Sequence, residues 1–309
     1  MQKQAAKPQK CQAITAIYRA LVSTLLLLVL IAACKAENQI NEHGTHFLWG
    51  VIPNQEPLFI LQGDKKGEGL GDLLYKTLQS KLPEYEHALF HAQFLRLLAE
   101  VAAGKQFCTI MAKAPERSTK FTFSKRPIVL TPAPRLIVVR EKLEAFRRQT
   151  GWNYGPIALD EILQMNPDLR LGILHGRTYG NKIDAILNNS DPMKNRLYRH
   201  SGFSGSQGLL RMQLAGRVDA SFESLWQIGP TPDRDEKRVL TIPIAKLPKY
   251  IELYIGCPKT TWGEQAIDRI NTAAQKSRRS LRDIPEPWMR REEILAYRKK
   301  YDQLYHWKQ

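Results

Sequence analysis

The sequence predicts an α/β protein in which mainly parallel sheets are flanked by helices. From residue 47 onward, short apolar runs alternate with segments of helical periodicity, which is typical of strand–helix alternation. A length of 309 residues is enough for two domains, each with its own core. A composition of 43% hydrophobic and 25% charged residues is that of a globular protein, and it argues against a disordered, collagen-like or polytopic membrane chain.

Residues 1–36 are predicted to be a removable secretory signal. The first 20 residues carry basic side chains and no acid, and the apolar run Leu21–Ala33 that follows is shorter than the ~20 residues that span a bilayer. The run ends in Leu30–Cys34, which resembles a bacterial lipobox and would make an acylated Cys34 the first mature residue. Two alternatives are cleavage after Ala36 with soluble secretion, and an uncleaved anchor.

The charge of the chain is strongly basic, with a formal net charge of +16. An extracytoplasmic location disfavours nucleic acid as the partner and brings anionic lipid head groups within reach of the basic residues 259–309. His87 and His91 have helical i, i+4 spacing, but no acidic or thiol partner completes a metal signature. We therefore expect no cofactor and no metal.

The first half of the chain shows two kinds of pattern. Strands are expected at Phe47–Val51, Phe107–Ala112 and Arg135–Val139, where short apolar runs occur. Helices are expected where leucines recur between Leu70 and Leu82, and over Phe94–Ala103, which Gly104 would end.

The second half repeats the alternation. Helices are expected at 141–148, Asn181–Leu187, Gln207–Leu214 with Ser206 as N-cap, 263–280, and a final helix with the apolar stripe Ile294, Tyr297, Tyr301, Leu304 and Tyr305. Strands are expected at Leu171–Leu174, Val218–Phe222 and Tyr250–Cys257.

One segment is more specific than any periodicity. Residues 108–117 end in Ala114-Pro115-Glu116-Arg117, and Phe121-Thr122-Phe123-Ser124 follows, with Pro127 shortly after. This segment resembles the T-P-E-R … F-x-F-S signature of bacterial extracellular solute-binding proteins of family 3, the polar amino-acid binding proteins of ABC importers. Residues 82–87 are similar to an uncharacterised, mostly proteobacterial subgroup of that family.

Other pieces follow in the family's order. They are Pro57-Leu58-Phe59, Gly67–Asp72 (one residue short of its motif), Gly172–Thr178 and Gly216–Ala220. The resemblance therefore covers roughly residues 47–275.

The resemblance implies a type II periplasmic binding protein fold, with two lobes joined by two hinge strands. Lobe 1 would comprise residues 45–138 plus 252–309, and lobe 2 would comprise residues 139–251. Such a protein captures a small anionic or zwitterionic solute by lobe closure, for an ABC permease or a sensor, and is not an enzyme. Its expected location is the periplasm, with a lipid anchor to the membrane.

Three residues match the family's ligand-binding positions. The resemblance implies that Arg117 clamps the ligand carboxylate, for which a guanidinium is a planar bidentate match. Thr178 precedes a predicted helix, whose free N–H groups would favour the same anion. Arg177 replaces a small residue of the family and would add positive charge. The alternatives are a helix-capping surface Arg117, a plain N-cap at Thr178 and a solvated Arg177.

The departures from the family concern the rest of the ligand. The position of the ammonium-binding Asp is Ser224 here, the covering aromatic falls at Glu56, and a hydroxyl position falls at Ala112. Glu223 precedes Ser224, but adjacent strand residues face opposite sides. We expect Glu56, Phe59 and Ser224 to line the cleft, with a core position as the alternative for Phe59. An anionic or carboxylate ligand fits better than an ordinary α-amino acid.

Three further residues are expected to be structural. Asp219 would orient the end of its strand. Cys108 and Cys257 lie on predicted strands; the sequence favours two buried thiols but leaves a disulfide open, because it does not supply their separation.

Two other functions stay open beside solute binding. The chain could be an interaction module of the cell envelope that keeps the fold but no longer binds solute. It could also be an envelope enzyme on the same fold, although no acid–base pair is visible in the sequence.

Overall fold

A computed structural model describes residues 46–53, 55–188, 196–201, 205–224, 226 and 238–306. The predicted signal and Cys34 lie outside these residues. No helix among the described residues is long and apolar enough to cross a membrane. The chain divides into two compact units, residues 1–47 with 84–86 and residues 48–83 with 87–309.

The described part of the first unit consists of His46, Phe47 and Glu84–Glu86. His46 Nδ1 lies 3.2 Å from Glu86 Oε2. The rings of Phe47 and Tyr85 meet edge to face, with centroids 5.4 Å apart. These contacts lie at the starts of two strands, β1 (His46–Val51) and β2 (Glu86–His91).

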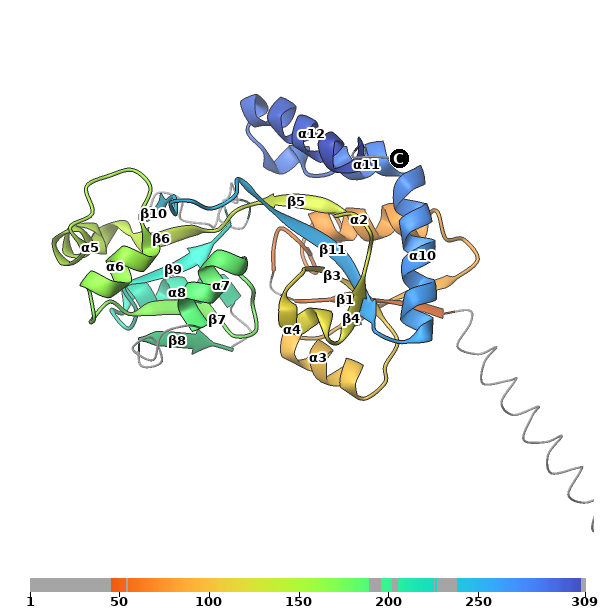
Figure 1. Ribbon diagram of the computed structural model, residues 1–309, viewed down its shortest axis with the longest axis horizontal. Helices are drawn as coiled ribbons and strands as arrows, with labels where there is room; N and C mark the ends of the chain where they lie inside the picture. Colours follow the sequence, from red (N-terminus) through yellow and green to blue (C-terminus); the bar gives the residue numbers. More distant parts are fainter. Residues whose placement is uncertain are drawn as a thin grey trace, which may run out of the picture. The chain divides into compact units, whose positions relative to one another are not determined.

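The first sheet has six strands (Figure 1). They are β1 (His46–Val51), β2 (Glu86–His91), β3 (Cys108–Ala112), β4 (Phe121–Phe123), β5 (Val129–Pro132) and β11 (Tyr250–Pro258). Their order is β2-β1-β3-β11-β4, and β5 also pairs with β11. A strand from the C-terminal part of the chain thus completes a sheet that the N-terminal part begins.

Helices α2 (Leu70–Gln79), α3 (Phe94–Ala102) and α10 (Thr261–Lys276) accompany this sheet. In α2 the leucines at the predicted spacing form the buried stripe. Asp72 caps its N-terminus by accepting the N–H groups of Gly69 at 3.1 Å and Ile60 at 2.9 Å. Burial raises the pKa of this carboxyl, and the two N–H groups oppose that shift.

The second sheet has five strands, in the order β10-β6-β9-β7-β8. They are β6 (Arg135–Val139), β7 (Leu171–Leu174), β8 (Leu197–His200), β9 (Ala220–Glu223) and β10 (Val239–Ile242). The helices in this region are α5 (Leu143–Thr150, after the 3-10 turn Arg140–Lys142), α6 (Leu159–Met165), α7 (Asn181–Asn188) and α8 (Gly205–Leu214).

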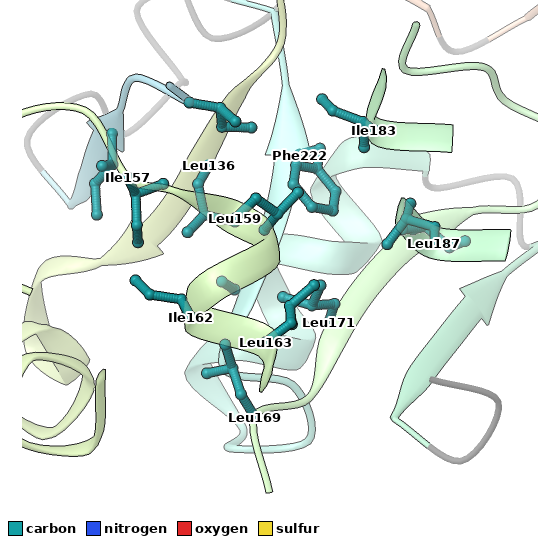
Figure 2. Packing of buried hydrophobic residues seen from close by; sticks show 14 of the residues in the cluster. Leu136, Ile157, Leu159, Ile162, Leu163, Leu169, Leu171, Ile183, Leu187 and Phe222 are labelled. Atoms are coloured by element: carbon teal, nitrogen blue, oxygen red, sulfur yellow. The ribbon is translucent and has the colours of Figure 1, made fainter. Parts of the chain in front are cut away.

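The hydrophobic core around the second sheet lies between its strands and these helices (Figure 2). Leu136, Leu171 and Phe222 extend from the strands and are at most 1% exposed. Residues of α6 and α7, including Leu159 and Ile183, close the other side. Each such side chain contributes about 1.5–3 kcal/mol when fully buried, so the amphipathic helices are stabilised mainly by this packing.

The chain passes between the two sheets twice (Figure 1). The first passage is at residues 133–134, between β5 and β6, and the second is at residues 243–249, between β10 and β11. Strand direction corrects one detail of the predicted fold. The parallel pairs are β1–β3, β7–β8 and β7–β9, whereas β11 and β6 run antiparallel to their neighbours, so both sheets are mixed. The reason is that the strand after each passage, β6 or β11, enters its sheet from the end opposite to its neighbours.

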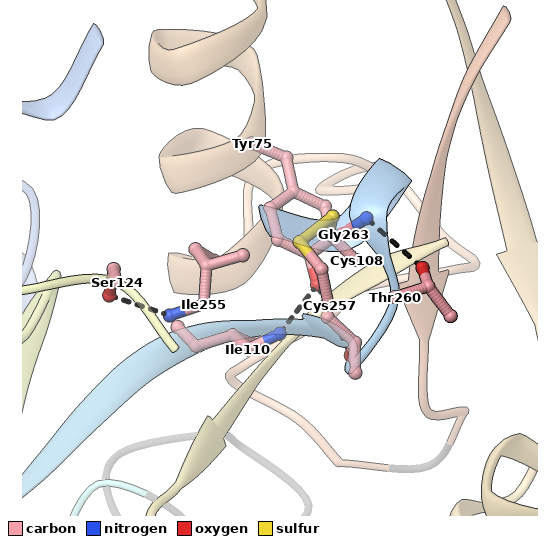
Figure 3. Close-up of a disulfide and its surroundings, with 9 residues drawn as sticks. Tyr75, Cys108, Ile110, Ser124, Ile255, Cys257, Thr260 and Gly263 are labelled. Carbon is pink, nitrogen blue, oxygen red and sulfur yellow. Dashed lines mark hydrogen bonds between the residues drawn. A yellow bond between two sulfur atoms is a disulfide. The ribbon is translucent and has the colours of Figure 1, made fainter. Parts of the chain in front are cut away.

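Cys108 and Cys257 form a disulfide, so the favoured expectation of two thiols is wrong (Figure 3). The pairing of Thr109 with Gly256 places the two cysteines opposite each other on β3 and β11, with their Cα atoms 4.3 Å apart. The bond lies beside Tyr75, whose hydroxyl oxygen accepts the N–H of Ile110 at 3.0 Å. The expectation failed because strand register, which decides this contact, is not legible in the sequence.

The last helices, α11 (Arg278–Asp283) and α12 (Arg291–His306), follow α10, with a 3-10 turn at Glu286–Trp288 between them. The predicted stripe of α12 is confirmed, since Tyr297 and Tyr301 are fully buried. The hydroxyls of Tyr301 and Tyr305 donate to the carbonyls of Ile128 and Pro127, both at 3.1 Å. These bonds attach α12 to the segment that leads into β5.

Several local expectations need correction. The predicted helix 263–280 is two helices, because the backbone leaves helical geometry at Ser277. Ser206 is not an N-cap, since α8 begins at Gly205 and the Ser206 hydroxyl donates to Glu223 instead. Strands β2, β4, β5, β8 and β10 and helix α6 were not predicted, since they are short or, like β2, mostly exposed and lack an apolar run.

Candidate functional site

A cavity of about 210 Å³ lies within the second unit. Its described lining comes from both sheets: the loop after β1, the start of α3, the end of β3, α4 (Pro115–Ser118) and β5 on one side, and the ends of β7, β8 and β9 on the other. Most lining side chains are apolar, among them Ile52, Leu70, Met111, Ile251 and Leu253. This volume is below the ~300–1,000 Å³ typical of drug-sized ligands, so the cavity suits a small molecule.

Arg117 is the deeply buried cation of this cavity, with 9% of its surface exposed. Its guanidinium donates to the carbonyl of Ala112 at 3.0 Å and to that of Gly176 at 3.2 Å. Burial lowers its pKa to about 10, and the charges of Asp184 and Glu116 oppose that shift. Arg117 therefore carries its charge at neutral pH, and no described residue forms an ion pair with it.

The carbonyl of Gly176 reaches Arg117 because of an unusual backbone. Gly176 has φ of 76°, in the left-handed region that favours glycine. A Cβ there would also meet Leu95 at 3.0 Å and Phe94 at 3.1 Å. The ring of Phe94 in turn lies under the guanidinium of Arg117, with the carbon of that group 4.4 Å from the ring centroid. The Arg117 guanidinium is thus held by the Gly176 carbonyl and by the ring of Phe94.

Thr178 lies on the cavity wall, in the loop between β7 and α7, and its contact with a ligand stays a prediction. Tyr179 anchors this loop: its buried hydroxyl accepts the N–H of Leu174 at 2.8 Å, and burial raises its pKa to about 12. The backbone N–H of Tyr179 donates to Asp184 Oδ1 at 2.9 Å. One of the N–H groups expected to bind an anion at this helix start is therefore already bound by a carboxylate of the chain.

Arg177 also lines the cavity, but its charge is neutralised. Its guanidinium forms two bonds to the Glu223 carboxylate, at 3.1 and 2.7 Å, and the side chains are only 18% and 5% exposed. Burial alone would lower the pKa of Arg177, but the charge of Glu223 outweighs it and the pKa lies above the ordinary value. Arg177 is thus neither a free positive charge nor the solvated side chain of the alternative.

Ser224 lies on the cavity wall and is 7% exposed. Its backbone N–H donates to Glu223 Oε1 at 3.0 Å, while its side-chain Oγ is buried without a hydrogen-bond partner among the described residues. A buried hydroxyl without a partner is uncommon in proteins, so Ser224 offers one neutral polar contact to a ligand.

The other predicted site residues are not brought into the cavity. Glu56 is exposed and does not line it. Phe59 is 1% exposed and packs on Tyr75, with ring centroids 5.4 Å apart, and against Gly71. It is a core aromatic, the alternative that its pattern left open. Ala112 does line the cavity, where it presents a methyl group.

Several contributors to the cavity were not predicted. Phe94 and Trp226 supply the aromatic surface that the resemblance assigned to another position. Phe94 is simply the first residue of an amphipathic helix in the sequence, so no local signal distinguishes it. Glu223 could have been suspected as a partner of Arg177, but only from the pairing of β7 with β9.

Acidic side chains do not occur among the described lining residues of the cavity. Its remaining polar groups include the side chains of Gln55, Gln93, His175 and His200. Within the described part of the chain, no group of three or more His, Cys, Asp or Glu side chains is placed to hold a metal ion. Asp219 is structural, as predicted: it accepts the backbone N–H of Arg170 at 2.7 Å and forms an ion pair with its guanidinium.

The sequence matches no protein-family model and no curated protein. Solved structures do resemble the chain. The putative L-cystine ABC transporter of Listeria monocytogenes has a TM-score of 0.60 at 18% identity, covering 80% of this chain and 97% of that one. A double-mutant form of the VFT2 domain of BvgS from Bordetella pertussis has a TM-score of 0.58 at 14% identity, covering 82% of this chain and 97% of that one.

 The ancestral amino acid-binding protein AncCDT-1, a precursor of cyclohexadienyl dehydratase, has a TM-score of 0.58 at 14% identity, covering 82% of this chain and 99% of that one.

At these identities the likeness concerns the fold. The similarity spans nearly the whole of each of these proteins. The predicted fold class is therefore confirmed. The protein has the two-lobed α/β fold of bacterial periplasmic binding proteins.

Proposed function

We propose that this protein is a periplasmic solute-binding protein of the family 3 type, which captures a small carboxylate-bearing solute in the cavity at Arg117. The observation that carries the proposal is the state of Arg117: it is charged, 9% exposed, open to the cavity and without an ion pair among the described residues. A buried charge is costly unless an opposite charge accompanies it. A ligand carboxylate would supply that charge and match the planar guanidinium.

The two-lobed fold supports the proposal, because both sheets contribute to the cavity wall and the chain passes between them at only two places. Rotation about these passages would open and close the cavity. We propose residues 45–138 with 252–309 and residues 139–251 as the two lobes. Similar proteins serve an L-cystine ABC transporter in one case and belong to BvgS in another, so both transport and sensing are suitable roles.

A titration of the purified full-length chain in mild detergent tests the proposal. Isothermal calorimetry with amino acids, dicarboxylates and simple carboxylates should detect at least one solute, and Arg117→Met should weaken its binding roughly 10- to 100-fold. Arg96→Met is the matched control, because Arg96 is exposed and pairs with Glu100 outside the cavity. The site assignment fails if Arg117→Met binds as well as the parent protein.

The envelope location forms a separate part of the proposal. Acylation of Cys34 would hold the protein at the membrane, and the basic residues 259–309 would meet anionic lipid. Labelling cells with a radioactive fatty acid should mark the protein, and Cys34→Ala should abolish the label. A labelled Cys34→Ala variant would contradict the anchor.

An interaction module is the second candidate function. The observation in its favour is the absence of an acidic side chain among the described lining residues, where amino-acid binding would need one. Recovery of a stable partner from an envelope extract, unaffected by any solute, would favour this role. Catalysis is not part of our proposal, although turnover of a bound solute beside His175 or His200 would indicate it.

A further inference from the structure

We infer that the cavity selects small apolar carboxylates that lack an α-ammonium group, and that it discriminates against the corresponding amino acids. This inference rests on the proposed function, because it names the class of solute that the same cavity takes. It depends on how the acidic and basic groups around the cavity are paired, which the titration of Arg117 alone does not test.

The carboxylate next to Ser224, the expected ammonium position, is that of Glu223, and it is already bonded to Arg177. Glu223 is the last residue of β9 and precedes Ser224. Its carboxylate accepts two bonds from Arg177, one from the Ser206 hydroxyl and one from the backbone N–H of Ser224. With 5% of its side chain exposed, it does not line the cavity. Glu223 therefore balances Arg177 and is not available to a ligand ammonium.

The neutral acceptors give little compensation. The carbonyls of Ala112 and Gly176 lie next to Arg117 and already accept its N–H groups. The Ser224 hydroxyl is a single neutral group without a partner among the described residues. Neutral polar side chains such as Gln55 and Gln93 also line the cavity, but the described lining contains no carboxylate. An ammonium group there would exchange its water shell for neutral contacts alone, and burying a charge on such terms is strongly unfavourable.

The rest of the lining suits a hydrocarbon body. Ile52, Leu70, Met111, Ile251 and Leu253 present apolar side chains. Phe94 holds the guanidinium of Arg117 against its ring face, and Trp226 adds a second aromatic surface. One end of the cavity is thus cationic and the remainder is largely apolar, which is the chemical complement of a short branched or aromatic monocarboxylate.

The test compares two solutes that differ only at the α-carbon. Leucine and 4-methylpentanoate share a carboxylate and a branched apolar body, but only leucine carries an ammonium. Calorimetry on the full-length chain should show that 4-methylpentanoate binds at least about tenfold more tightly than leucine. The pair of 3-phenylpropanoate and phenylalanine repeats the comparison with an aromatic body. No variant is needed for this measurement.

A charge placed at Ser224 sharpens the comparison. Ser224→Asp adds a carboxylate to the cavity wall and should shift the preference toward leucine by about tenfold or more. Ser224→Asn has a similar shape without the charge and should not shift it. Circular dichroism and thermal melting establish that both variants are folded.

The outcomes separate the two proposals. Leucine binding as tightly as 4-methylpentanoate, or more tightly, overturns the inference and leaves the proposed solute-binding function standing. Binding of neither solute pair and of no other carboxylate to the folded protein overturns both. A preference for 4-methylpentanoate that falls about tenfold or more in Ser224→Asp and persists in Ser224→Asn supports the inference.

Discussion

Two arginines, Arg117 and Arg177, line the same cavity and have opposite roles in the structure. Arg117 extends from α4, next to the first sheet, and within the described part of the chain its guanidinium donates only to neutral carbonyls. Arg177 lies in the loop after β7 of the second sheet and is locked onto Glu223 by two hydrogen bonds. The difference indicates that a guanidinium at a cavity wall is available to a ligand carboxylate only where the chain does not itself provide a carboxylate.

The largest effect is expected from breaking the Arg177–Glu223 pair. Glu223→Ala leaves the buried Arg177 without its carboxylate and should lower the free energy of unfolding by about 3–5 kcal/mol. Replacing both residues, as Arg177→Met with Glu223→Leu, should restore most of that loss, because no unpaired charge then remains. Urea denaturation of the single and double variants measures the coupling. Losses that simply add would show that the pair does not act as a unit.

A somewhat smaller loss of stability is expected when the disulfide of the first sheet is removed. Cys108→Ala with Cys257→Ala should lower the free energy of unfolding by about 2–4 kcal/mol, because the bond joins strands 149 residues apart in sequence. Neither cysteine lines the cavity, so ligand preference should not change. Urea denaturation, with and without reductant, checks the first point, and calorimetry checks the second. A variant of unchanged stability would contradict the prediction.

The smallest effect on stability is expected from Arg117 itself. Arg117→Met loses two hydrogen bonds to neutral carbonyls but also removes a buried charge, so the free energy of unfolding should change by less than about 1 kcal/mol. The same substitution should nevertheless reduce binding most strongly. Urea denaturation distinguishes this from Glu223→Ala. A stability loss as large as that of Glu223→Ala would mean that Arg117 is structural.

Much of the fold was predictable because its signals are local. The buried strand β7, the amphipathic stripe of α2 and the tyrosine stripe of α12 appear in the sequence as runs or periods of apolar residues. The directions of β6 and β11 and the pairing of Cys108 with Cys257 depend on register between distant strands, which no local pattern contains.

Individual residues of the candidate site could be predicted from motifs in the sequence, but the contacts between them could not. Arg117, Thr178, Arg177 and Ser224 were expected to bind ligand, and all four lie on the cavity wall; their contact with a ligand stays a prediction. The residues Glu56 and Phe59 were expected there too, but one lies at the surface and the other in the core. The sequence could not show that Glu223 neutralises Arg177, because that contact joins the loop after β7 to the end of β9, 46 residues away in the chain.

A crystal structure of the protein with 4-methylpentanoate tests the central claim most directly. We predict that both carboxylate oxygens lie within hydrogen-bonding distance of the Arg117 guanidinium, while Arg177 remains bonded to Glu223 and the methyl groups contact the apolar wall. A carboxylate bound to Arg177 with Glu223 released, or a ligand that does not touch Arg117, would contradict the account.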